Sequence, residues 1–167
     1  MAEALDVDAV KKYGFMVWTY KMGEQVSLMI HLGDRLGLYR ALHGAGPRTS
    51  TALAEELGLS ERLVREWLLG QAAARLLDRH DDGTFELSEV GASFLADEED
   101  SLSFALGAFR GGTDPAHLEA LAQSFRTGLG VTYEQQGTAA AAGLARMTGP
   151  WSRLALTSTI LPALDGV

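Results

Sequence analysis

The chain has 167 residues, of which 47% are hydrophobic and none is cysteine. A chain of this size can bury one sizeable core, but without cysteine it can form neither a disulfide nor a thiolate metal site. The formal net charge is −8. No apolar run reaches the roughly 18 to 20 residues of a membrane span, and the N-terminus lacks the apolar core of a secretory signal. We therefore expect a cytoplasmic protein with no membrane partner.

The first predicted element is a long helix over residues 14–42. The polar side of this helix, which carries His31, is expected to face solvent. Gly33 and Gly37 favour a break of the helix near Gly33. The helix either packs on its own core or pairs with the same helix of a second subunit in a homodimer. Its apolar side chains fall at alternating spacings of three and four, with Gln25 as the one polar exception, which is the pattern of a helix–helix seam: Phe15, Trp18, Met22, Met29, Leu32, Leu36 and Tyr39.

The second segment predicts a winged helix. Thr49 or Ser50 can cap a first short helix, and Gly58 can end it in a Schellman turn. Ser60 then caps a second helix over residues 61–77. Two extended runs follow, and Asp81-Asp82-Gly83 between them favours a tight hairpin turn. The inner stripe of the second helix is expected to be Leu63, Val64, Trp67, Leu68 and Ala72.

The remaining residues are predicted to be helical. Pro115 begins a helix that Gly128 stops, an alanine-rich helix covers residues 133–147, Gly149-Pro150 interrupts it, and a last helix covers residues 151–164. The fold class is therefore mainly α, a winged helix-turn-helix with one β-hairpin and additional N- and C-terminal helices. The parts are N-terminal helices (1–48), the winged-helix unit (49–100) and C-terminal helices (101–167). The expected apolar anchors of the C-terminal helices are Leu118, Leu121, Ala122, Phe125, Leu154, Leu156, Ile160 and Leu161.

Charge argues against nucleic acid as a partner. Binding to DNA depends on lysine and arginine that neutralise phosphates. Residues 49–100 instead carry four arginines, no lysine and thirteen acidic residues, a net charge of −9. On the outer face of the second helix, Leu69 and Ala73 occupy positions where a DNA-binding protein would place polar groups. We expect that face to contact protein, and its arginines to pair with nearby acids.

No catalytic, cofactor-binding or metal residue is predicted in this chain. The four histidines are scattered with no i, i+4 pair, so they do not suggest a metal site. The glycines between residues 107 and 112 do not follow a strand, and such a position is needed for a phosphate- or cofactor-binding turn. No nucleophile-elbow motif surrounds a serine. The chain is therefore expected to be inactive by itself.

Three stretches together resemble one known arrangement. IHLGDRLGLYRAL with GPRTSTALAEELGLSERLVREWLLGQAAARLL, then SFRTGLGVTYEQQG, then ILPALDGV follow the order of the winged-helix N-terminal region of class I S-adenosylmethionine-dependent small-molecule methyltransferases. The resemblance implies a domain that dimerises and caps the substrate cavity. It also implies S-adenosylmethionine as the cofactor of the full-length protein, bound by a following Rossmann-like domain that is absent after Val167. TSTILPAL lacks the aromatic residue that such regions often carry before their Leu-Pro.

The same resemblance implies candidate substrate contacts. Tyr133 matches a position that is often aromatic and near the substrate, and Phe15, Trp18 and Met22 could wall a pocket for a hydrophobic or aromatic acceptor. Ordinary core or dimer packing is the alternative for all four residues. The alternative function is a stand-alone winged-helix transcriptional regulator or small-ligand-binding protein.

Overall fold

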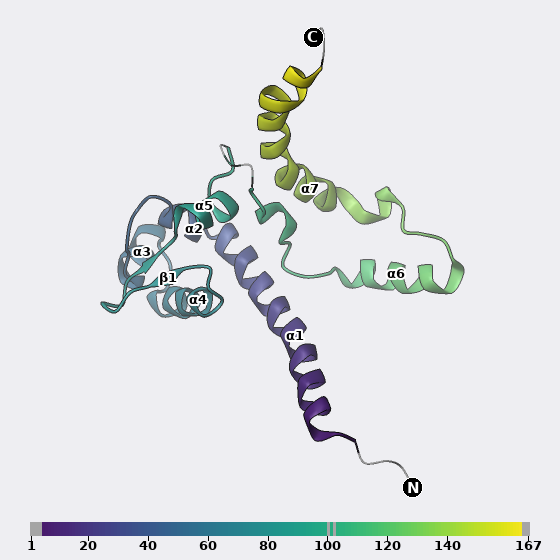
Figure 1. The fold of residues 1–167 in the computed structure, drawn as a ribbon, viewed down its shortest axis with the longest axis horizontal. Coiled ribbons are helices and arrows are strands. Elements are labelled where there is room, and N and C mark those ends of the chain that lie inside the picture. Colours follow the sequence, from purple (N-terminus) through teal and green to yellow (C-terminus); the bar gives the residue numbers. More distant parts are fainter. Residues whose placement is uncertain (1–4, 100, 102, 165–167) are drawn as a thin grey trace.

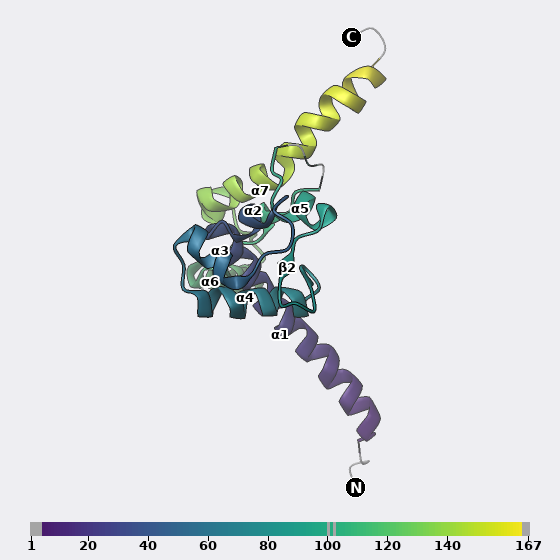
Figure 2. The same cartoon turned by 90° about the vertical axis from the view of Figure 1, so that its left-hand side faces the viewer.

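The computed structural model describes residues 5–99, 101 and 103–164. A winged-helix body carries α1, which projects from it, and an arm formed by α6 and α7 (Figure 1). In the view of Figure 2 the two termini lie at opposite ends. The predicted fold class is confirmed: the structure is mainly helical, with one antiparallel two-stranded hairpin. The elements in chain order are α1 (Val7–Arg35), α2 (Leu38–Leu42), α3 (Ser50–Leu57), α4 (Glu61–Ala73), β1 (Asp78–Arg79), β2 (Phe85–Glu86), α5 (Glu89–Leu95), the short 3-10 helix η1 (Leu106–Ala108), α6 (Pro115–Thr127), α7 (Tyr133–Ala155), the π-helical turn η2 (Leu156–Ile160) and the 3-10 turn η3 (Leu161–Ala163).

Local signals place both ends of α3 and the start of α4 as predicted, whereas α4 ends at Ala73 and not at residue 77. The Thr49 hydroxyl accepts a hydrogen bond from the Ala52 amide at the start of α3. Gly58 adopts the left-handed conformation, and the amide of Leu59 returns to the Ala54 carbonyl. Ser60 occupies the cap position of α4 but makes no side-chain capping bond. The hairpin pairs Asp78 with Glu86 and Arg79 with Phe85.

The core lies between α2, α3, α4 and the hairpin. Its largest fully buried apolar side chains are Leu38, Tyr39, Leu42, Leu53, Leu68 and Leu106. Leu63, predicted for the inner stripe of α4, is 63% exposed instead. Val64, Trp67 and Leu68 fill the inner face. Leu63 precedes Val64 by one position, and because each residue turns the helix by 100°, its side chain points outward.

The sequence predicted a break of the first helix near Gly33, but the helix is continuous at that residue. It continues to Arg35, and the break comes at Gly37, whose φ is +75°. A Cβ added at Gly33 would lie 2.4 Å from Trp67 Cζ2 and 2.8 Å from Tyr39 Cε2. Glycine at position 33 therefore allows α1 to approach the body closely. The Trp67 indole N–H donates to the Met29 carbonyl at 2.9 Å and secures this contact.

The C-terminal arm also corrects the sequence-based prediction. The helix α7 continues through Gly149 and Pro150 to Ala155, and its interruption lies at Gly137, where φ is 77° and ψ is 166°. Pro150 is buried, so its packing offsets the backbone hydrogen bond that proline cannot make. No residue of α6 is buried, and Leu118 and Phe125 of its predicted apolar face are 61% and 92% exposed. Asp100 and residues 165–167, which end the predicted winged-helix unit and the stretch ILPALDGV, lie outside the described residues.

Within the ranges that the structure covers, no helix has the length and apolar character needed to span a bilayer.

Candidate functional site

The predicted helix–helix seam divides into a free half and a packed half. Phe15, Trp18 and Met22 are exposed on the projecting part of α1, at 72%, 67% and 51%. Leu32 and Leu36 are also exposed, whereas Met29 packs partly against the core. Tyr39, by contrast, is only 1% exposed and lies against Trp67 with ring centroids 5.0 Å apart. Tyr39 is therefore a core residue that a partner subunit cannot reach.

A second apolar face on α1 was missed. Val10, Tyr13, Val17 and Tyr20 are all exposed, and their spacing of three and four places them on one side of the helix. At 100° per residue the centre of this side lies about 120° around the helix from Trp18. The spacing was visible in the sequence, but the stronger Phe15–Tyr39 pattern concealed it. A helix that is apolar on two sides is normally buried on both.

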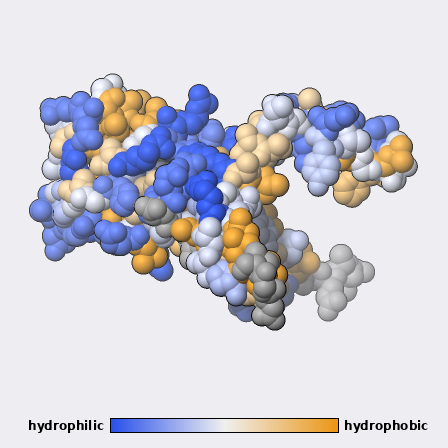
Figure 3. Space-filling view, turned by 90° about the horizontal axis from the view of Figure 1, so that it is seen from above, coloured by the Kyte–Doolittle hydropathy of each residue, from blue (hydrophilic) through white to orange (hydrophobic). Residues whose placement is uncertain are grey.

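Exposed apolar groups also occur on the C-terminal helices. The space-filling view in Figure 3 shows orange side chains at the surface in separate patches, on the body and on the projecting parts. Isolated apolar side chains at a surface are ordinary, but patches on projecting helices indicate a contact with another polypeptide. The large exposed members of this group are Trp151, Leu156, Ile160, Leu161 and Leu164.

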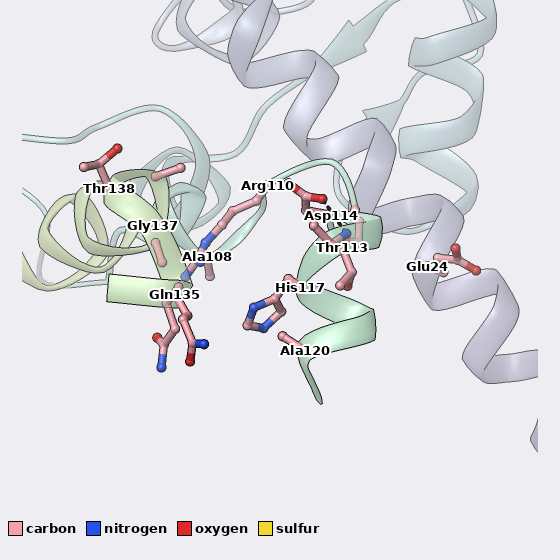
Figure 4. A pocket seen from close by; sticks show the side chains of 16 residues that line it. Glu24, Ala108, Arg110, Thr113, Asp114, His117, Ala120, Gln135, Gly137 and Thr138 are labelled. Atoms are coloured by element: carbon pink, nitrogen blue, oxygen red, sulfur yellow. Dashed lines mark hydrogen bonds between the residues drawn. The ribbon is translucent and has the colours of Figure 1, made fainter. Parts of the chain in front are cut away.

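A cleft lies between α6 and the start of α7, and α1 and the loop after η1 also contribute to its lining (Figure 4). Its volume is about 1130 Å³. None of the four predicted pocket residues lines it: Phe15, Trp18 and Met22 lie farther along α1, and Tyr133 is 89% exposed just before the lining residue Gln135. The lining is mostly small or polar, with Ala108, Arg110, Thr113, His117, Ala120, Gln135, Gln136, Thr138, Ala139 and Ala140 as its main members.

Two close contacts hold the loop after η1, which lines the cleft. His31 Nδ1 lies 2.9 Å from the Phe109 carbonyl, and a Cβ added at Gly111 would lie 2.8 Å from the same imidazole. His31 was predicted to face solvent, but it is half-buried here. On the other side, a Cβ at Gly107 would come 2.3 Å from the Gly143 carbonyl. The backbone of η1 therefore touches the backbone of α7, and only glycine fits there.

A buried ion-pair network joins the arm to the body. Arg146 on α7 donates to both oxygens of Asp34, at 2.5 and 2.9 Å, and also to Glu98 at 2.8 Å. Arg40 approaches Asp34 at 3.2 Å, and the Arg146 guanidinium lies 5.2 Å from the Phe104 ring centroid. Burial by itself would raise the pKa of Asp34, but the hydrogen bonds and charges of Arg146 and Arg40 outweigh it and hold that pKa below its usual value.

Sequence reasoning missed this network. An acidic residue in the last turn of a helix is unfavourable to the helix dipole, and Asp34 occupies such a position in α1. That anomaly was the one available signal, because Asp34 and Arg146 are 112 residues apart. Among the described residues, no group of three or more histidine, aspartate or glutamate side chains is arranged to hold a metal ion.

Comparison with known families identifies the body. Residues 24–97 match the Rv2258c-like winged helix-turn-helix domain. These residues form a winged helix-turn-helix that is similar to the members of this family. The matched range begins within α1 and ends after α5, so it includes the contact of Trp67 with α1 as well as the hairpin.

The relatives of the winged-helix domain are methyltransferases. The demethylspheroidene O-methyltransferase of Cereibacter sphaeroides is 46% identical over 59 residues, which are 34% of this chain and 16% of that protein. The structure of the mitomycin 7-O-methyltransferase MmcR superposes with a TM-score of 0.67 at 27% identity, over 96% of this chain and 50% of that one. The human N-acetylserotonin methyltransferase, in complex with SAM, shares the fold at 20% identity, with a TM-score of 0.59 over 99% of this chain and 51% of that one. The chain thus spans about half the length of these solved structures and corresponds to their N-terminal region.

Proposed function

We propose that this chain is the dimerisation and substrate-capping part of an S-adenosylmethionine-dependent small-molecule O-methyltransferase of the cytoplasm. The observation that carries the proposal is the helix α1, which leaves the winged-helix domain with exposed apolar residues on two faces. The similarity to MmcR extends over 96% of the chain, so it covers the arm as well as the winged-helix domain.

The cofactor would be bound by another domain of the full-length protein. In the described residues the two strands form a single hairpin, and no glycine-rich turn follows a strand. They therefore do not fit S-adenosylmethionine, which class I sites hold at such a turn. The role of the present residues is to bind and shield the acceptor, since excluding water and positioning reactants supply much of the catalysis in group transfer.

The two faces of α1 define how a homodimer would form. A second copy that paired through α1 alone would cover the Trp18 face and leave Tyr13, Val17 and Tyr20 in water. The partner therefore has to supply two surfaces, with α1 lying between them. The exposed apolar residues of the C-terminal helices, such as Leu156 and Ile160, provide a second surface of suitable chemistry. A homodimer of this kind is an isologous contact, in which each chain gives and receives the same helix.

Sedimentation velocity at micromolar concentration tests the dimer. We expect the wild-type chain to sediment as a dimer, and Trp18→Glu and Tyr20→Glu each to weaken dimerisation by about 30-fold or more, because a buried aromatic contact contributes about 2 kcal/mol or more at an interface. Tyr133→Glu is the matched control, since Tyr133 is an exposed aromatic residue outside α1. A monomeric wild type, or two α1 variants that sediment like the control, would contradict the proposal.

A winged-helix regulator is the competing function, and the proposed methyltransferase role excludes nucleic acid as a partner. On α4, Arg65 lies 3.6 Å from Glu61, so its predicted pairing with a nearby acidic residue is confirmed. Leu69 packs partly against the core. The net charge of −9 over residues 49–100 is unfavourable for contact with phosphates. Fluorescence anisotropy with a labelled DNA duplex at 50 and 200 mM salt tests this alternative. Binding that weakens steeply with salt would favour the regulator.

A further inference from the structure

We infer that the cleft between α6 and α7 receives a carboxylate-bearing aromatic ligand and that Arg110 binds its acid group. The inference rests on the proposed function, in which this ligand is the methyl acceptor. Figure 4 shows the side chains of Arg110 and His117 directed into the space between the two helices, with Gln135 beside them. These groups belong to the cleft lining, together with small residues from both walls.

Arg110 is held in position by the contacts around it. The residue before it, Phe109, is tied to His31 through its carbonyl, and the residue after it, Gly111, lies against the same imidazole with φ at +79°. The arginine side chain then crosses α7 at Gly143, where an added Cβ would lie 3.0 Å from Arg110 Nε. The loop and Gly143 together restrict where the guanidinium can lie. The side chain of Arg110 would therefore lose little conformational entropy when a ligand binds.

Arg110 is the one arginine or lysine among the residues that line the cleft. Two acidic residues also line it, and each has a hydrogen-bond partner other than Arg110. Asp114 caps α6 by accepting the Ala116 amide at 2.8 Å, and Glu24 pairs with Lys21 at 2.5 Å. No ion pair with an acidic side chain is found for Arg110 among the described residues. An unpaired guanidinium favours a carboxylate, because the two planar groups can form two parallel hydrogen bonds.

The size and walls of the cleft indicate the rest of the ligand. Its volume of about 1130 Å³ is at the upper end for small-molecule sites. Ala116 and Ala120 on α6 and Ala139 and Ala140 on α7 line the cleft, so part of each wall presents methyl groups. A flat ring can lie between such walls, with its carboxylate toward Arg110 and a second polar group toward Gln135 or His117.

Calorimetric titration with 2-naphthoate and 2-naphthamide tests the inference, since the two probes share a ring system and differ in the charge of one group. We expect the wild-type chain to bind 2-naphthoate at least tenfold more tightly than 2-naphthamide, because hydrogen bonds to a charged group contribute at this level. Arg110→Gln should remove this preference. Arg126→Gln, which makes the same change on α6 outside the cleft, should leave it unchanged.

Three results would overturn the inference: no binding of 2-naphthoate, equal binding of the two probes, or an unchanged preference in Arg110→Gln. His117→Gln is a second variant that leaves the loop intact, and we expect it to weaken 2-naphthoate binding severalfold. Sedimentation of the same samples separates the two proposals. A dimer without a preference for the acid overturns only the ligand class, whereas a monomer that prefers the acid contradicts the dimerisation role alone.

Discussion

Asp34→Asn is expected to loosen the C-terminal arm from the winged-helix domain. The substitution removes the negative charge that faces Arg146 and Arg40 and one of the two oxygens that accept hydrogen bonds from Arg146. Breaking a fully buried ion pair costs about 3–5 kcal/mol. Here Arg146 keeps Glu98 and its side chain is 30% exposed, and Arg40 is half-exposed. We therefore expect a loss of about 2 kcal/mol at pH 7, or about 4–8 °C in the melting temperature of a chain of this length.

The same variant has a characteristic pH dependence. Because the pKa of Asp34 is lowered in the folded state, its ion pairs stabilise the protein above the unfolded pKa of about 3.9. That stabilisation disappears as the pH falls through the lower, folded pKa. Asparagine does not titrate, so the difference between wild type and Asp34→Asn should be full at pH 7 and should shrink at pH values below about 4.

Urea unfolding followed by tryptophan fluorescence, at pH 7 and again at pH 3, measures both effects. Asp8→Asn is the control, because Asp8 lies in an exposed pair with Lys11 at 3.6 Å and such pairs contribute less than about 1 kcal/mol. If Asp34→Asn unfolds at the same urea concentration as the control, the network does not hold the arm. A difference that persists undiminished at pH 3 would show that its origin is not the charge on Asp34.

Two further substitutions test the packing of the body and the arm. Gly107→Ala places a methyl group 2.3 Å from the Gly143 carbonyl oxygen. We expect the free energy of unfolding to fall by about 1–3 kcal/mol and proteolysis within α7 to become faster. Wild-type stability of this variant would refute the close backbone contact. Tyr39→Phe removes the hydroxyl that donates to Gln71 at 2.5 Å and leaves a buried acceptor unpaired; urea unfolding should show a loss of about 1–3 kcal/mol, whereas Tyr13→Phe on the exposed face of α1 should show none.

Three predictions that depended on neighbouring residues were accurate. The cap at Thr49, the left-handed Gly58 and the Asp81-Asp82-Gly83 turn each involve contacts within a few positions. Their physics is therefore contained in a short window of sequence, and the winged helix could be recognised from it.

Predictions that required knowledge of what packs against a residue were less accurate. Gly33 suggested a helix break because glycine weakens isolated helices, but in the structure it makes room for Trp67. Likewise, Gly149 and Pro150 suggested a helix end, whereas the burial of Pro150 allows α7 to continue. Helical spacing identified Tyr39 as apolar but could not decide between the core and a partner subunit.

Four features could be predicted from sequence patterns alone: the order of the helices, the hairpin, the acidity of the winged-helix segment and the apolar character of α1. Three features could be seen only in the folded chain. They are the exposure of particular apolar residues, the contact of Asp34 with Arg146 across 112 positions, and the presence of Arg110 and His117 in one cleft, which none of the predicted pocket residues lines. The division has a physical reason. Helix caps and turns are satisfied by groups a few residues away, whereas burial, ion pairing and cavity shape depend on segments that only folding brings together.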